Sequence, residues 1–222
     1  MDNKEIKLAR LTRADGRMLT ETGYNFVIGL VLVWGILIDC VMAAYFTPAI
    51  LQLNYLAVLI IYLIGSLGCT YIVYKSDNPA VSFLGFTGLA VCMGLLLTFY
   101  VSAYDVASVS QAFMATGIVT IVMVIGATLF PAFFRKLGGG LTIALIASII
   151  VELIAGLIFR LNLTFMDYAI VLIFCGYIGF DWSRAQAYPK TLDNAIDSAA
   201  DIYVDVVNVF IRILSILGKK KD

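Results

Sequence analysis

Five polar residues near the end of the chain could carry chemistry. Asp197, Asp201, Asp205, Asn208 and Arg212 follow one another at intervals of three or four residues, so a helix would place them on one face. The opposite face of that helix would be apolar. Carboxylates cost free energy at membrane depth and usually serve a function there. The stripe therefore predicts a functional site in an otherwise hydrophobic chain.

A further acid, Asp181, ends the apolar segment before this helix, 24 residues ahead of Asp205. The short polar loop between the two segments predicts neighbouring antiparallel helices. Asp205 would lie about ten residues, roughly 15 Å, into its helix, so contact requires the loop to dip or the last helix to start lower. If the two carboxyl groups meet in a low-dielectric site, they would share a proton and titrate near neutral pH.

The composition indicates an all-α integral membrane protein. Of its 222 residues 62% are hydrophobic and 14% are charged, whereas a soluble domain has about 45–50% apolar and 25% charged residues. There is no histidine, which leaves carboxylates as the proton sensors near neutral pH. The four cysteines stand singly in apolar runs without CxxC spacing and are interpreted as small buried hydrophobes.

Seven apolar segments predict a seven-transmembrane-helix bundle. The domain organisation expected is a polar N-terminal segment at 1–22, one transmembrane domain at 23–218 and a basic tail at 219–222. Gly138, Gly139 and Gly140 would form a flexible joint before the fifth segment, and Asp105 and Asp167 would be solvated charges in outer loops. The segments are Tyr24–Phe46, Leu53–Tyr74, Val81–Val101, Ala112–Phe130, Leu141–Phe159, Tyr168–Phe180, which is short unless it begins near Leu163, and Ala195–Leu217.

Basic residues collect on one side if the N-terminus is cytoplasmic and all seven segments cross. Lys219, Lys220 and Lys221 are the exception, because a seventh crossing leaves them outside. Either the last helix crosses against the rule or it re-enters, and its length favours a crossing. We expect a multi-pass protein of the cell (plasma or inner) membrane with lipid as its surroundings.

Two more acids, Asp39 and Glu152, lie inside predicted helices. Each would be costly facing lipid, so each is expected to face the bundle interior. A satisfied interhelical hydrogen bond and a place in an ion pathway are both open for them. An interfacial amphipathic helix is a weaker interpretation of the last segment, because it is too apolar from Ile202 to Leu217.

The end of the chain resembles a known family. Phe180-Asp181, followed by Ile-Tyr-Val-Asp205-Val-Val-Asn208-Val-Phe, is similar to the C-terminal signature of the Bax inhibitor-1 family, the transmembrane Bax inhibitor motif proteins, and in particular to its bacterial members. The resemblance implies a seven-helix bundle with the last helix near the centre and a pH-dependent calcium leak. Asp181 and Asp205 would then be the proton-sensing pair that gates the pore.

Several other residues are candidates in such a channel. Carboxylate oxygens suit calcium and line cation pathways, with calcium as the permeating ion and no cofactor expected. Family members commonly carry a basic cluster after the second helix, where this chain has only Lys75. Lys75 and Arg212 are therefore the candidates for a gating latch. The pathway candidates are Asp197, Asp201, Asn208, Glu152 and Asp39.

Two alternatives to a channel come from other classes of function. Intramembrane aspartyl proteases also carry aspartates on their sixth and seventh helices, but their Gly-x-Gly-Asp and Pro-Ala-Leu motifs are missing here. The chain could instead be an interaction protein that modulates a membrane-anchored protease or another membrane protein through its N-terminal segment. That segment, with Lys4, Lys7, Arg10 and Arg13, is as easily a lipid anchor. No soluble catalytic motif and no sign of a nucleic-acid partner is present.

Overall fold

A computed structural model describes residues 18–159 and 164–221 of the chain. Within these ranges the regular structure is helical and comprises eight helices. One isolated β-bridge joins Tyr104 to Lys220. The basic residues of the N-terminal segment, Lys4, Lys7, Arg10 and Arg13, lie outside the described ranges, so the interaction role predicted for that segment stays a prediction.

Six of these helices are long and apolar enough to cross a membrane, and the chain is a multi-pass membrane protein. They are α2 (Glu21–Tyr45), α4 (Tyr55–Lys75), α5 (Pro79–Ser102), α6 (Val106–Leu129), α7 (Pro131–Leu157) and α8 (Thr164–Ala185). The others are the short α3 (Thr47–Ile50) and the last helix, α9 (Leu192–Leu217). Because α9 carries the acids, it is not among the six, and a seventh crossing stays a prediction.

The ends of the helices follow from local sequence. The side chains of Thr20, Asn54, Asn78 and Asp105 each accept a backbone N–H in the first turn of α2, α4, α5 and α6. Such N-caps satisfy donors that the helix itself leaves unpaired. Proline lies in the first turn of α5 and of α7, where its missing N–H costs nothing.

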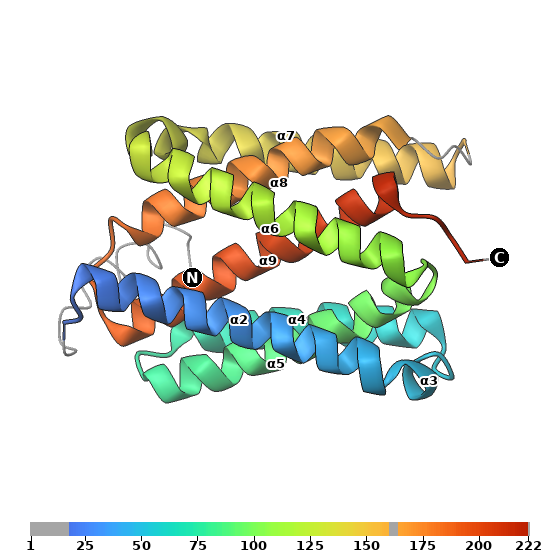
Figure 1. Cartoon of the computed structure of the whole chain (residues 1–222), viewed down its shortest axis with the longest axis horizontal. Coiled ribbons are helices and arrows are strands. Elements are labelled where there is room, and N and C mark those ends of the chain that lie inside the picture. The colour runs from blue at the N-terminus through green and yellow to red at the C-terminus, as the bar shows by residue number, and fades with distance from the viewer. Residues whose placement is uncertain (1–17, 160–163, 222) are drawn as a thin grey trace. The chain divides into compact units, whose positions relative to one another are not determined.

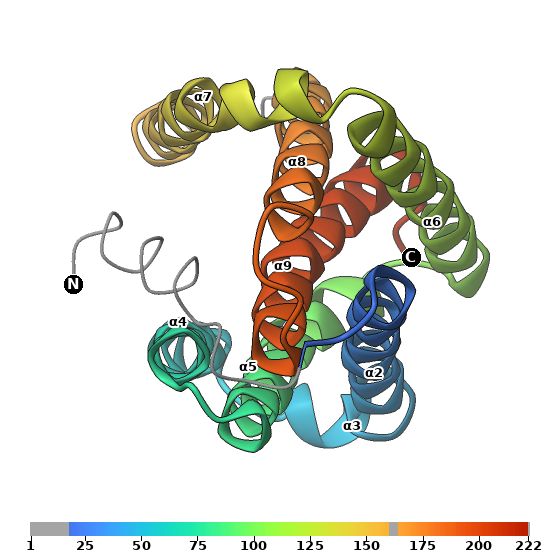
Figure 2. The ribbon, with the colours of Figure 1, turned by 90° about the vertical axis from the view of Figure 1, so that its left-hand side faces the viewer.

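The chain divides into two compact units. Unit 1 comprises Met1–Ala103 and Ala187–Tyr203, and unit 2 comprises Tyr104–Gln186 and Val204–Asp222. In unit 1, α5 packs against α4, α2 and α3 (Figure 1). In unit 2, α8 packs against α7 and α6 (Figure 2). Helix α9 contributes its residues to both units, with the division after Tyr203.

The three consecutive glycines do not form a joint, contrary to the expectation from sequence. They lie inside α7, which begins at Pro131. At membrane depth a broken helix would expose unpaired backbone groups, which favours an unbroken helix through these glycines. At Gly138 a Cβ atom would lie 2.5 Å from the ring of Phe180. The glycine therefore allows α8 to approach α7 closely.

Helix α8 is also longer than the apolar run that predicts it. It extends from Thr164 to Ala185, because polar residues continue the helix at both ends. Asp181 is held within the helix by an ion pair with Arg184, whose Nη1 lies 2.9 Å from Oδ1 of the aspartate. The placement of Asp167 in an outer loop was wrong, since it lies in the first turn of α8.

Candidate functional site

The polar stripe of α9 begins one turn earlier than the sequence analysis proposed. Asp193, Asp197, Asp201 and Asp205 follow one another at intervals of four residues. Three of them are buried, with exposed fractions of 5%, 0% and 5% for Asp193, Asp197 and Asp205. Asp193 was missed because the helix was expected to start at Ala195, although the same spacing extends to it. Asp193, in the first turn, also suits the positive end of the helix dipole.

Hydroxyl groups from two other helices of unit 1 meet this stripe. The Oγ of Ser82, on α5, donates a hydrogen bond to Oδ1 of Asp193 at 2.7 Å. The hydroxyl of Tyr74, on α4, donates to Oδ1 of Asp201. Hydrogen bonding offsets the cost of burying a carboxylate. The pathway candidate Asp201 therefore has a defined partner, and Asp197, from the same stripe, is fully buried.

The start of α9 is also tied to the start of α2. The hydroxyl of Tyr24 donates to the carbonyl of Asn194 at 3.2 Å and hydrogen-bonds with the hydroxyl of Ser198 at 3.1 Å. The Nζ of Lys190 lies 4.5 Å from the centre of the Tyr24 ring, and burial lowers the pKa of this lysine. The backbone N–H of Leu19 donates to the carbonyl of Lys190 at 2.7 Å. These contacts fix the loop before α9 against α2.

Asp39 is paired with the tyrosine of the family-like motif. The hydroxyl of Tyr203 lies 3.0 and 2.8 Å from the two carboxylate oxygens of Asp39. Tyr203 is 0% exposed and Asp39 is 6% exposed. The tyrosine ring packs edge-on against Phe86, with ring centres 5.3 Å apart. A Cβ on Gly35 would come within 2.9 Å of both rings, so this glycine makes room for the aromatic pair.

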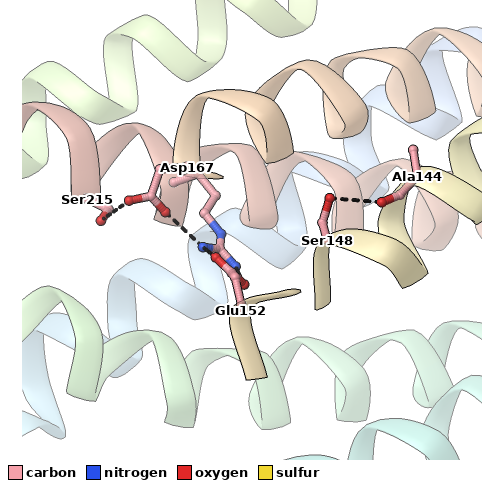
Figure 3. Close-up of polar contacts among 6 residues, drawn as sticks. Ala144, Ser148, Glu152, Asp167 and Ser215 are labelled. Carbon is pink, nitrogen blue, oxygen red and sulfur yellow. Dashed lines mark hydrogen bonds and ion pairs between the residues drawn. The ribbon is translucent and has the colours of Figure 1, made fainter. Parts of the chain in front are cut away.

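The other end of α9, in unit 2, carries a charge cluster (Figure 3). Arg212 binds Glu152 of α7 through both terminal nitrogens, at 2.6 and 3.0 Å. Its Nη1 also donates to Oδ1 of Asp167 at 2.8 Å. The hydroxyl of Ser215 donates to the second oxygen of Asp167 at 2.9 Å. We call Arg212, Glu152, Asp167 and Ser215 the Arg212 cluster.

The Arg212 cluster shows the surroundings of two acids, Asp167 and Glu152, whose environment was predicted from the sequence. Asp167 is not a solvated surface charge, since its side chain is 13% exposed and it binds Arg212. The question left open for Glu152 is answered in part, because it makes an interhelical ion pair. Bidentate arginine–carboxylate pairs are stronger than single hydrogen bonds and also fix the relative orientation of the two side chains. The cluster therefore holds α7, α8 and α9 together at one end of unit 2.

Asp181 and Asp205 both belong to unit 2 and both are buried. Asp181 binds Arg184 on its own helix. A shared proton between the two aspartates stays a prediction. Asn208, one turn beyond Asp205, donates from Nδ2 to the carbonyl of Val204 at 2.8 Å.

The second latch candidate, Lys75, lies at the end of α4. Its Nζ is 5.7 Å from the centre of the Tyr71 ring on the same helix, and the side chain is exposed. Its role as a latch stays a prediction. Arg212, by contrast, already holds two carboxylates in the structure.

Most of the chain resembles known proteins. The family model described as "Inhibitor of apoptosis-promoting Bax1" matches residues 20–222. The chain is 26% identical to the Golgi anti-apoptotic protein of Vaccinia virus (strain Lister) over 156 residues, which is 69% of this chain and 65% of that protein. It is 39% identical to Bax inhibitor 1 of Schizosaccharomyces pombe over 90 residues, which is 38% of this chain and 32% of that protein. The matched segments thus span just under two thirds of the viral protein and about one third of the yeast protein.

Proposed function

The chain belongs to the Bax inhibitor-1 family, and from this premise we propose that it is a pH-sensitive calcium leak gated by Asp181 and Asp205. The observation that carries the proposal is the row of four aspartates at intervals of four residues along α9, three of them buried. Hard cations such as calcium are bound by oxygen ligands, and acids of this kind line cation pathways. Calcium is the permeating ion in this proposal and no cofactor takes part.

The proposal includes α9 as a seventh crossing helix of the bundle, near its centre. Its 26 residues correspond to about 39 Å of helix, which exceeds the roughly 30 Å of the hydrocarbon core. One unbroken helix does not turn back on itself as a re-entrant segment does. The chain beyond α9 supports this, because the carbonyl of Lys219 accepts from the N–H of Asp105 at 3.1 Å, just before α6. The three terminal lysines would then lie at the outer end of the bundle.

The proposed sensor is a pair of buried carboxyl groups. When two acids share a low-dielectric site, one proton is held between them and their titration belongs to the pair. The ion pair between Asp181 and Arg184 places a positive charge beside one member of this pair. With the N-terminus cytoplasmic, Asp181 lies near the cytoplasmic end of α8, so the pair would respond to internal pH. Asp197, Asp201 and Asn208 would line the pathway on the same helix.

Arg212 is the proposed latch at the other end of the pathway. It holds Glu152 and Asp167 in one cluster, so a permeating cation would have to compete with a tethered guanidinium for these oxygens. Lys75, at the end of α4, is the corresponding candidate at the inner mouth. Asp39, bound to Tyr203, is the pathway candidate of α2.

Calcium flux in proteoliposomes tests this function. The full chain is reconstituted with a trapped calcium dye, and flux is measured from about pH 5 to pH 8 for the wild type, Asp181→Asn and Asp205→Asn. We expect the wild type to respond to pH and both variants to lose the response, because neither retains two titrating carboxyl groups. Asp77→Asn, an exposed aspartate between α4 and α5, is the matched control and keeps the response. A full pH response in Asp205→Asn would refute the gating pair.

A second candidate function is suggested by the similarity to the viral anti-apoptotic protein. That protein is similar to 69% of this chain. We therefore propose, as the alternative, that the chain acts through another membrane protein, such as a membrane-anchored protease. Pull-down of the full chain from detergent, with and without residues 1–20, tests this role. Loss of a bound protein on removal of the segment supports it, and unchanged capture contradicts it.

A further inference from the structure

Two cysteines face each other across the contact between α4 and α5 of unit 1. Cys69 lies on α4 and Cys92 on α5, and these two helices pack against each other. A Cβ on Gly65 of α4 would lie 2.6 Å from the Sγ of Cys92. A Cβ on Gly88 of α5 would lie 2.7 Å from the Sγ of Cys69. Each thiol therefore rests against backbone of the facing helix, at a glycine.

The register of the two helices brings the thiols together. A three-residue turn, 76–78, joins α4 to α5, so the helices run antiparallel. Gly65 and Cys69 are one turn apart on α4, and Gly88 and Cys92 are one turn apart on α5, so the two glycine–cysteine contacts lie about 6 Å apart along the helices. Helical side chains tilt toward the N-terminus of their own helix. Each thiol thus tilts toward the other from its own glycine contact.

We propose that Cys69 and Cys92 are an oxidisable thiol pair that a peroxide converts into a disulfide between α4 and α5. Each thiol loses its hydrogen and one S–S bond forms. The peroxide O–O bond breaks and accepts two electrons and two protons, so hydrogen peroxide leaves as two molecules of water. Both cysteines are free thiols of intermediate exposure, so a small oxidant can reach them from the surroundings.

The pair changes the interpretation of these cysteines as inert hydrophobes. A small buried hydrophobe would pack against a glycine just as well, but it would not need a second thiol one turn away on the facing helix. The other two cysteines provide an internal comparison. Cys40 lies on α2 and is exposed, and Cys175 lies on α8 in unit 2. Neither belongs to the α4–α5 contact.

Oxidation of the full chain in lipid nanodiscs tests the proposal. The protein is treated with hydrogen peroxide, remaining thiols are alkylated with N-ethylmaleimide, and intact mass and peptide mapping locate any disulfide. Of the four cysteines, we expect Cys69 and Cys92 to escape alkylation and to appear in one cross-linked peptide pair. Cys69→Ser and Cys92→Ser should abolish the cross-link, whereas Cys40→Ser and Cys175→Ser should retain it.

A second measurement separates geometry from oxidant access. Copper phenanthroline, a stronger oxidant for neighbouring thiols, is applied to the same preparations. If no cross-link forms with this reagent, or if Cys69→Ser still forms a disulfide, the pairing is wrong. If the cross-link forms with copper phenanthroline but not with peroxide, peroxide sensitivity is refuted. An oxidised wild type should also unfold at a higher temperature than its reduced form, because a cross-link restricts the unfolded chain. The Cys69→Ser variant should show no such difference.

Discussion

Removal of a single hydroxyl, in Tyr203→Phe, tests whether the Asp39–Tyr203 pair stabilises unit 1. The substitution keeps the ring and its edge-on contact with Phe86. It removes the donor that lies 3.0 and 2.8 Å from the two carboxylate oxygens of Asp39. Because both side chains are buried, water does not simply replace the lost hydrogen bond.

The expected loss in the free energy of unfolding follows from the ranges known for two related kinds of hydrogen bond. Hydrogen bonds between membrane helices contribute about 0.6 kcal/mol on average and up to about 1.7. Hydrogen bonds to charged groups contribute about 1.5–3 kcal/mol. We expect Tyr203→Phe to lower the free energy of unfolding by about 1.5 kcal/mol. For a chain of this size that corresponds to a melting temperature lower by roughly 3–6 °C.

Thermal unfolding in detergent measures the effect. Loss of helical circular dichroism reports unfolding, since the regular structure of the described residues is helical. Tyr168→Phe is the matched control, because Tyr168 is 57% exposed on α8, and it should leave the melting temperature unchanged. A double-mutant cycle with Asp39→Ala isolates the pair. In the Asp39→Ala background, Tyr203→Phe should cost close to nothing.

Two outcomes would refute this reasoning. If Tyr203→Phe melts together with Tyr168→Phe and the wild type, the hydrogen bond contributes no stability. If Tyr203→Phe costs as much in the Asp39→Ala background as in the wild type, the hydroxyl acts through some other group. Either result would remove the pairing as the reason for a tyrosine at this position of the motif.

Three further predictions use the same melting assay. Gly35→Ala should lower the free energy of unfolding by about 1–3 kcal/mol, because the new methyl group collides with two aromatic rings. Gly29→Ala is the control, because nothing lies within 4 Å of its Cβ, and it should leave stability unchanged. Equal effects of the two substitutions would contradict this prediction. Arg212→Gln should cost more than Glu152→Gln, since it leaves two carboxylates without the cation that binds them; the reverse order would show that the Arg212 cluster is not held by charge. The pKa of Asp105 is held below its usual value by a backbone N–H in the first turn of α6, so its capping contribution should be complete above about pH 4 and be lost as the pH falls through the lowered pKa. Asp105→Ala should show a flatter melting temperature against pH than the wild type in this range.

Local sequence was sufficient for the class of fold. Long apolar runs and proline or cap residues mark most helices, because the membrane forces backbone hydrogen bonds inside each segment. The polar face of α9 follows from spacing alone, since residues three or four apart share a side of any helix. The residues of the motif around Asp205 were enough to identify the family. Each of these properties depends on neighbours within a few turns of chain.

The predictions were wrong where a distant partner in the sequence determines the environment of a residue. Gly138 suggested a joint, but the ring of Phe180 on another helix requires a glycine within α7. Asp167 suggested a surface loop, but Arg212, 45 residues away, binds it. Composition indicates that such residues are flexible or solvated on average, and it carries no information about which segment packs against them.

The stripe of α9 has some properties that the sequence determines and others that only helix packing determines. Its positions, its acids and its place near the end of the chain are properties of the sequence. Its partners are not, because Ser82 and Asp193 are 111 residues apart and Tyr74 and Asp201 are 127 apart. Pairs at such separations meet only when helices pack, and packing depends on the shapes of all the side chains at each contact. The sequence by itself determined that buried acids lie on one helical face, and the tertiary structure decided which hydroxyl or guanidinium group each of the paired acids would meet.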